Sequence, residues 1–211
     1  MNAHTKRQIR KIISPFRRIG LKNFDFSIIS NNCWGGGVLY DVYGLQYRSP
    51  TIGMYFFADD YVKFINNLPQ YLSLQMQPLK IEASRHKEEI IKNGNVNSPL
   101  GYVGDVEVVF VHYKSAEEGC KKWNSRRKRV NYNNLLVKFS DQNFFSDAEY
   151  EAFIASDFKH KLFFTSNRKY LSENYCVFIE KYEDNGYVVD DIKVSRNAVQ
   201  IKKILNSLPE G

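Results

Sequence analysis

The stretch FDFSIISNNCWGGGVLYDVYG, residues Phe24 to Gly44, decides the fold class of this chain. It begins with an apolar run typical of a β-strand, over residues 24–29, and continues into a polar, glycine-rich loop. Apolar residues at helical spacing follow, and Gly44 is expected to end that helix. A strand that leads through a loop into a helix is the repeating unit of an α/β domain.

Strand and helix patterns continue in alternation along the chain. Strands are predicted over residues 106–111, which are rich in valine as buried parallel strands are, and over residues 134–139 and 161–165. Four further helices are predicted. The first is capped by Asp59 or Asp60 and runs through Asn67, two begin at the caps Ser115 and Ser146 or Asp147, and the last closes the chain over residues 197–208. We therefore predict an α/β fold, a three-layer sandwich whose mainly parallel sheet has helices on both faces.

The chain of 211 residues is long enough for one domain with an extension. Residues 1–20 are predicted to form a basic amphipathic N-terminal helix, which Pro15 is expected to kink. Such a helix either packs its apolar side on the domain or rests that side on anionic lipid. Residues 21–211 are predicted to form a single α/β domain with an inserted segment near 75–102.

The composition restricts the functional classes. The net charge of +7 favours an anionic partner, but the basic residues are too few and too local for nucleic acid. Cys33, Cys120 and Cys176 lie far apart with no zinc-binding spacing, so we expect no metal site and a reducing compartment. No apolar run is long enough to span a bilayer, and no signal peptide is recognised, which favours the cytoplasm or the inner face of the membrane. The sequence does not identify a cofactor.

The loop after the first predicted strand is the first candidate site. Ligands of parallel α/β sheets bind beyond the carboxyl ends of the strands. Glycines allow a ligand close to the backbone, asparagine amides bind hydroxyl groups or a base, and a helix N-terminus attracts anions. The residues predicted to bind ligand here are Ser30, Asn31, Asn32, Trp34, Gly35 and Gly36. The alternative is a tight turn that only packs a helix on the strand.

Two residues are candidates for catalysis. Cys33 is the nucleophile candidate of the loop, because a helix N-terminus lowers a thiol pKa. His112 ends the predicted strand 106–111, so it is expected on the same rim, where it would act as a general base. The alternatives are a small core cysteine and a histidine hydrogen-bonded within its own turn.

The segment WNSRRKRVNYNN, Trp123 to Asn134, is the second candidate site. Its arginines suit bidentate contacts to a phosphate or a sugar carboxylate, and its asparagines add polar donors. The residues predicted to bind ligand here are Arg126, Arg129, Asn131 and Asn134. The alternative is an ordinary charged surface in contact with water.

Several blocks of rare residues together resemble a known family. They are SNNCWGG, SPTIG, YVKFINNLPQYL, GDVEVVFVHY and KWNSRRKRVNYNN, in this order within residues 24–165. They resemble a bacterial family of unknown function whose members are often labelled exopolysaccharide or capsule biosynthesis proteins. The resemblance implies an α/β fold and a surface-polysaccharide context. The resemblance implies no particular catalytic residue in this chain.

These observations lead to two functional expectations. The first is a metal-independent glycosyl- or acyltransferase of surface-polysaccharide biosynthesis that acts on a sugar acceptor and binds an anionic molecule such as a nucleotide sugar or a phosphorylated glycan. The second is a non-catalytic sugar- or nucleotide-binding or regulatory protein of the same pathway. Replacing His112 with alanine separates them, because only a transferase has turnover to lose.

Overall fold

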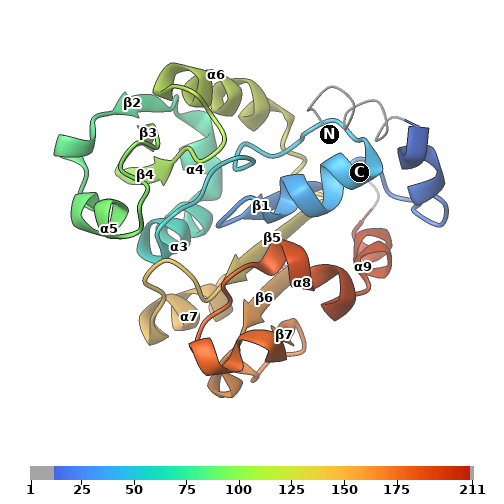
Figure 1. Cartoon of the computed structure of the whole chain (residues 1–211). Helices are drawn as coiled ribbons and strands as arrows, with labels where there is room; N and C mark the ends of the chain where they lie inside the picture. Colours follow the sequence, from blue (N-terminus) through green and yellow to red (C-terminus); the bar gives the residue numbers. More distant parts are fainter. Residues whose placement is uncertain (1–11, 210–211) are drawn as a thin grey trace.

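The computed structural model describes residues 12–209, and two β-sheets organise them (Figure 1). The larger sheet is parallel, in the order β1-β5-β6-β7, with strands at Ser27–Ser30, Leu135–Ser140, Lys161–Thr165 and Cys176–Phe178. The smaller sheet is antiparallel, in the order β2-β3-β4, with strands at Gln77–Leu79, Leu100–Val103 and Val106–Val109. The predicted α/β fold is confirmed.

Short helices connect these strands. The α-helices are α2 (Asp41–Tyr43), α3 (Ala58–Asn66), α4 (Leu68–Ser73), α5 (Lys87–Lys92), α6 (Ala116–Arg126), α7 (Asp147–Ile154), α8 (Asp191–Ala198) and α9 (Ile201–Ser207). A π-helix spans Gly35–Tyr40, and 3₁₀ turns span Ile81–Ala83, Arg127–Arg129, Arg168–Tyr170 and Glu180–Asn185. Residues 12–17 are helical as well, whereas residues 1–11 of the predicted N-terminal helix lie outside the described part. None of the described helices combines the length and the apolar character that crossing a membrane requires.

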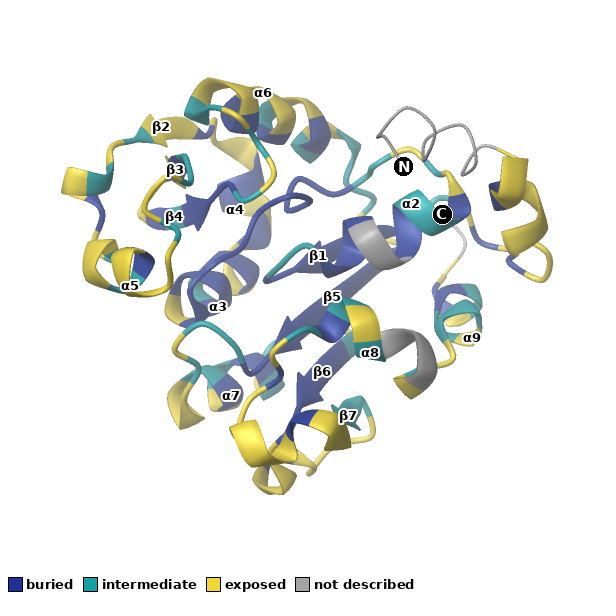
Figure 2. Cartoon of the chain, in the orientation of Figure 1, coloured by how far each residue is buried: buried dark blue, intermediate teal, exposed yellow. Residues whose placement is uncertain are grey.

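The parallel sheet is covered on both faces. Along β5, Val137 and Phe139 face a core that α3, α4, α6 and α7 share with the small sheet. Leu136 faces a second core, which the π-helix, α2 and α9 close. Because side chains alternate along a strand, one strand supplies both cores. Strands β1 and β5 are buried at every residue, whereas the edge strand β7 is half-buried, as Figure 2 shows.

The strand predicted over residues 106–111 forms at Val106–Val109, but its predicted parallel pairing is wrong. Val106–Val109 pairs antiparallel with β3 through a tight turn at Gly104 and Asp105, where Gly104 has a φ of 60°. Val106 and Val108 face the α3 side, and Val109 faces Tyr55 and α5, so both sides of the strand are buried. A strand buried on both sides has the same valine-rich pattern in either kind of sheet. The segment predicted as an insertion, 75–102, supplies β2, α5 and β3 beside this strand.

Some helix boundaries differ from the expected ones. Helix α3 begins at Ala58 after Phe57, which has no capping side chain, so the predicted cap at Asp59 or Asp60 is wrong. The predicted helix over 197–208 is two helices, α8 and α9, separated at Val199 and Gln200.

Two predicted caps are confirmed. The hydroxyl of Ser115 accepts a hydrogen bond from the backbone N–H of Glu118 at the start of α6. Ser146 and Glu149 form a complete capping box at the start of α7.

Gly119 sets the distance between α6 and the small sheet. A Cβ at this position would lie 2.5 Å from Cε2 of the buried Phe110 ring, which Gly101 approaches from β3. We expect Gly119→Ala to lower the free energy of unfolding by about 1–3 kcal/mol, as overpacking does. Alanine gains about 1 kcal/mol over glycine inside a helix, so a stabilised variant would show that helix propensity outweighs the contact. Urea unfolding measures the change, with the exposed Lys121→Ala as control.

Candidate functional site

Polar side chains converge where β1 and β5 end side by side. Ser30 ends β1 and Ser140 ends β5, and the two strands are parallel neighbours. Asn31 and Asn32 follow β1 directly, and Asp191 reaches the same place from the start of α8. We call this group the Lys138 cluster, and its members are Lys138, Asp191, Asn31, Asn32, Ser140 and Gln142.

Lys138 lies at the centre of this cluster and is completely buried. Its ammonium forms an ion pair with Asp191 and donates to the Ser140 hydroxyl at 3.0 Å and to Asn31 Oδ1 at 3.3 Å. It also lies 5.2 Å from the centre of the Phe164 ring. Burial lowers the pKa of Lys138, although the carboxylate of Asp191 acts in the opposite direction.

The two asparagines hold the cluster together. Asn32 Nδ2 donates to Gln142 Oε1 and to Asp191 Oδ2, both at 2.7 Å, and its Oδ1 accepts from the backbone N–H of Trp34. Asn31 Nδ2 donates to the carbonyl of Ser140 at 3.2 Å. These amides, predicted to bind ligand, therefore bind other parts of the chain in this structure.

Two buried polar atoms near the ends of these strands have no hydrogen-bond partner among the described residues. They are Nε1 of Trp34, which follows the loop, and Oγ of Ser166, which follows β6. Trp34 is fully buried and packs edge-on against Phe164 at 5.5 Å. A buried polar atom without a partner costs free energy, but these two atoms do not set this region apart, because Nε1 of Trp123 in the main core is also without a partner.

Gly35 and Gly36 open the π-helix in close contact with neighbouring side chains. A Cβ on Gly36 would lie 2.6 Å from Cγ2 of Ile52, and one on Gly35 would lie 3.2 Å from Cγ2 of Ile28. Both glycines are buried. Close packing of the π-helix on Ile28 of β1 and on Ile52 therefore accounts for both glycines without a ligand.

Cys33 and His112 lie on either side of the segment that contains Gly53. The Cys33 thiol donates to the carbonyl of Met54 at 3.5 Å, and the backbone N–H of His112 donates to the carbonyl of Gly53 at 3.2 Å. Burial raises the pKa of Cys33 to about 12, so the thiol is protonated at neutral pH. His112 is exposed and follows the small sheet, so the expectation that it ends a strand of the parallel sheet is wrong. No interaction joins the two side chains in the part of the chain that the structure describes.

A cavity of about 710 Å³ lies between residues 12–18, the end of the π-helix with α2, and α6. We call it the basic pocket, and its lining residues are Ser14, Pro15, Arg18, Tyr40, Asp41, Gly44, Leu45, Gln46, Tyr47, Lys122, Ser125, Arg126 and Arg129. Two of them, Arg126 and Arg129, are residues that the sequence predicts to bind an anion.

The arginines of this pocket differ in how they are held. Arg126 is buried, and its Nη1 donates hydrogen bonds to the carbonyl of Ile52 at 3.1 Å and to the Tyr113 hydroxyl at 2.6 Å. Its guanidinium lies over the Tyr47 ring, 4.8 Å from the ring centre. Arg18 donates to the carbonyls of Tyr43 and Gly44. Nε of Arg129 is buried and makes no hydrogen bond within residues 12–209. The pocket thus holds oriented guanidinium groups with donors to spare.

The other two residues predicted in this segment lie elsewhere. Asn131 Nδ2 donates to Asp25 Oδ2 at 2.7 Å, and the side chains of Asn134 and Asn23 exchange two hydrogen bonds. These contacts fix the amino ends of β1 and β5, and neither asparagine lines the basic pocket.

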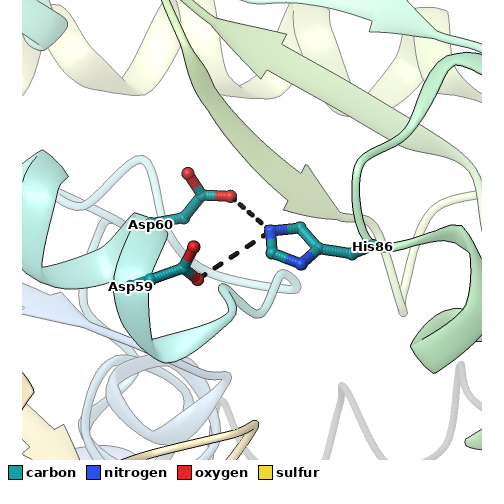
Figure 3. Close-up of side chains that lie close together, drawn as sticks. All are labelled: Asp59, Asp60 and His86. Atoms are coloured by element: carbon teal, nitrogen blue, oxygen red, sulfur yellow. Dashed lines mark hydrogen bonds and ion pairs between the residues drawn. The ribbon is translucent and has the colours of Figure 1, made fainter.

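Asp59, Asp60 and His86 form a third group, between α3 and the turn before α5 (Figure 3). Asp60 is fully buried. Its carboxylate accepts hydrogen bonds from Nη2 of Arg85 at 2.5 Å and from the backbone N–H of Glu107 at 3.2 Å. It also pairs with Nε2 of His86 at 2.9 Å. The oxygens that a metal ion would need are therefore already bound to cations and to the backbone. This group ties α3 to the small sheet.

His86 makes the stability of this connection depend on pH. Burial alone would lower the pKa of His86, but the hydrogen bond and charge of Asp60, with Asp59 and Glu107 nearby, raise it above its ordinary value, and Arg85 shares the same carboxylates. Because the folded state then binds the proton more tightly, this stabilisation is complete below the unfolded pKa, near 6.5, and is lost as the pH rises through the folded pKa.

We expect the free energy of unfolding to fall by about 1 kcal/mol as the pH rises from about 5.5 to about 8.5, from this group alone. Urea unfolding of the natural chain and of His86→Gln at each pH isolates the contribution. His112→Gln, at an exposed position, is the control. A difference between the natural chain and His86→Gln that does not change with pH would contradict the proposed proton linkage.

Comparison with known proteins supports this chain's place in one family. A family model described as "Domain of unknown function (DUF1919)" matches residues 4–208, nearly the whole chain. The chain belongs to this family. An uncharacterised protein of Haemophilus influenzae is 27% identical over 194 residues, which cover 92% of this chain and 86% of that protein. The match to the family model, over residues 4–208, includes the strands, the Lys138 cluster and the basic pocket.

The sequence prediction missed the central residue of one site and part of the other. Lys138 stands inside a predicted strand of this DUF1919 chain between apolar neighbours, and a lysine in such a place was the available signal. Asp191 was not identifiable, because 53 residues separate it from Lys138. Arg18 and Tyr47, which complete the basic pocket, gave no local signal.

Proposed function

We propose that this chain binds an anionic, phosphate-bearing ligand in the basic pocket. One observation carries the proposal: among the described residues, four cationic side chains and a single carboxylate, that of Asp41, line one cavity. The four cations are Arg18, Lys122, Arg126 and Arg129. This excess of positive charge in a concave site favours a ligand with at least two negative charges.

The state of the arginines supports the proposal. Arg126 is buried, and both of its hydrogen bonds come from Nη1, so Nε and Nη2 make none within the described residues. Arg129 keeps a buried Nε without a partner. Guanidinium groups recognise phosphate through two parallel hydrogen bonds, which these nitrogens would supply. The volume of about 710 Å³ suits a small molecule such as a nucleotide sugar.

The chemical class of the ligand follows from the resemblance noted in the sequence. Proteins labelled as exopolysaccharide or capsule biosynthesis proteins work with activated sugars, and we propose a nucleotide sugar or a phosphorylated glycan as the ligand. We place this activity in the cytoplasm, because the three cysteines are free and a reducing compartment suits unpaired thiols.

A thermal-shift comparison tests this function. The ligands are UDP-glucose, inorganic pyrophosphate and, as the uncharged control, glucose. We expect the phosphate compounds to raise the melting temperature by several degrees at saturation, and glucose to have no effect. Arg129→Gln should abolish most of the shift, whereas Lys121→Gln, on α6 outside the pocket, should keep it. An unchanged shift in Arg129→Gln would place the ligand elsewhere, and no shift with any phosphate compound would refute the proposal.

A metal-independent transferase is the second candidate, favoured by the buried ion pair of the Lys138 cluster beside the Cys33 loop. This cluster occupies the carboxyl ends of parallel strands, where α/β enzymes place their chemistry. The protonated thiol of Cys33 disfavours a thiolate nucleophile, and the proposed base is His112, which follows the small sheet rather than the parallel sheet. A transferase should lose turnover but keep binding in His112→Ala.

A further inference from the structure

Three large apolar side chains near the N-terminus share one exposed face. Ile12, Phe16 and Ile19 follow the helical spacing i, i+4, i+7 and are 69%, 70% and 71% exposed. We call this set the N-terminal apolar face. It lies on the helical segment 12–17 and on the turn 18–20 after it, drawn dark blue in Figure 1 and coloured mostly as exposed in Figure 2. In these residues the apolar side does not pack on the domain, contrary to the first sequence interpretation.

The opposite side of the same segment makes the contacts with the domain. Ser14 is buried, and Arg18 donates to the carbonyls of Tyr43 and Gly44. At 100° per residue Ser14 lies opposite Ile12 and Phe16, and Arg18 follows in the turn after the helix. The segment is thus held by its polar side, which leaves its apolar side outward.

Positive charge lies beside this face, on the side where Ile19 meets α9. Arg17, Lys202 and Lys203 line a second cavity, of about 640 Å³, whose other walls include Val42, Val199 and Ile201. Lys202 Nζ donates to the carbonyl of Ile19 at 2.8 Å, which places the start of α9 beside the face. None of these three cations forms an ion pair within the described residues. Cations beside apolar walls suit a lipid phosphate with its attached hydrocarbon.

We propose that the N-terminal apolar face docks this protein on an anionic lipid bilayer. Its apolar side chains enter the boundary between headgroups and acyl chains, and Arg17, Lys202 and Lys203 neutralise lipid phosphates. A second copy of this chain fits less well, because it would bring the same cations against themselves in a protein that already carries a net charge of +7. The N-terminal apolar face is separate from the basic pocket: Ser14 and Arg18 of the same segment line that pocket, but none of Ile12, Phe16 and Ile19 does.

Sedimentation of the full chain with lipid vesicles tests the docking. We expect binding to vesicles of phosphatidylcholine mixed with phosphatidylglycerol, weak binding to phosphatidylcholine alone, and release at high salt. The double variant Phe16→Ser/Ile19→Ser should bind at least about tenfold more weakly, since two exposed apolar groups no longer insert. Phe144→Ser is the matched control, because Phe144 is also exposed, at 57%, and lies outside this face, so it should bind as the natural chain does.

Three results would overturn the proposal. One is no binding to anionic vesicles at low salt. Another is equal loss of binding in Phe144→Ser and in Phe16→Ser/Ile19→Ser. The third is self-association in solution that only Phe16→Ser/Ile19→Ser removes, which would assign the face to a second copy. Arg129→Gln should keep vesicle binding, so a failure of the basic pocket and a failure of the docking surface are distinguishable.

Discussion

Lys138→Met is expected to lower the free energy of unfolding by about 3–5 kcal/mol, the usual cost of removing one partner of a buried ion pair. The side chain of Lys138 is fully buried and that of Asp191 is 3% exposed. Methionine fills a similar volume but leaves the carboxylate of Asp191 without its cation. The hydrogen bonds that the ammonium donates to Ser140 and Asn31 are lost as well. The effect therefore comes from an uncompensated buried charge rather than from a cavity.

Lys193→Met is the matched control for this variant. Lys193 forms an ion pair with Asp190 one position before Asp191, but its side chain is 76% exposed, so we expect a change within about 0.5 kcal/mol. The double variant Lys138→Met/Asp191→Leu should recover much of the stability, because it removes both charges. Urea unfolding of the four proteins gives all three differences. Equal effects of Lys138→Met and Lys193→Met would mean that α8 does not bury Asp191 on the sheet in solution.

Arg126→Lys is expected to weaken binding of a phosphate compound about 10- to 100-fold, although the charge is kept. The guanidinium of Arg126 is fixed by the carbonyl of Ile52, by the hydroxyl of Tyr113 and by the ring of Tyr47. An ammonium group can neither stack in this way nor form two parallel hydrogen bonds to a phosphate. Losing one charged hydrogen bond, worth about 1.5–3 kcal/mol, gives about this range.

The reverse exchange at a neighbouring position is the control. Lys122 also lines the basic pocket but is exposed and forms no ion pair within the described residues, so Lys122→Arg should change the affinity by less than about threefold. Calorimetric titration with inorganic pyrophosphate measures both. If the two exchanges have equal effects, Arg126 contributes only charge, and the geometry of the pocket is not what recognises the ligand.

Much of the fold could be predicted from local patterns. The strands after Phe26, Asn134 and His160 have apolar residues in both alternating sets, which is typical of a sheet covered on two faces. The valine-rich strand was also located, but its partner was not, because pairing depends on the turn at Gly104 and on contacts distant in sequence. The sequence correctly predicted the helix starts at Ser115 and Ser146. Helix α3 begins after Phe57 without a capping side chain, so the sequence contains no such signal there.

The candidate sites could be predicted only in part, because each joins distant segments. The loop at Asn31 was correctly placed at a strand's carboxyl end, but its partners on β5 and α8 are more than 50 residues apart in sequence from each other. Arg126 and Arg129 were identified from their own segment, and the other pocket residues Arg18 and Tyr47 are more than about 75 residues earlier in the sequence. The roles of all predicted site residues stay predictions.

The most direct test of the central proposal is a calorimetric titration of the natural chain and of Lys122→Gln/Arg129→Gln with UDP-glucose at low ionic strength. Both positions line the basic pocket, and neither side chain forms a hydrogen bond or ion pair that holds the fold within the described residues. We predict saturable binding of one molecule by the natural chain, weakened by added salt, and at least about a 100-fold loss in the variant, the worth of two charged hydrogen bonds of about 1.5 kcal/mol each. Binding of equal strength in both proteins, or no binding by the natural chain, would contradict a phosphate site in this pocket.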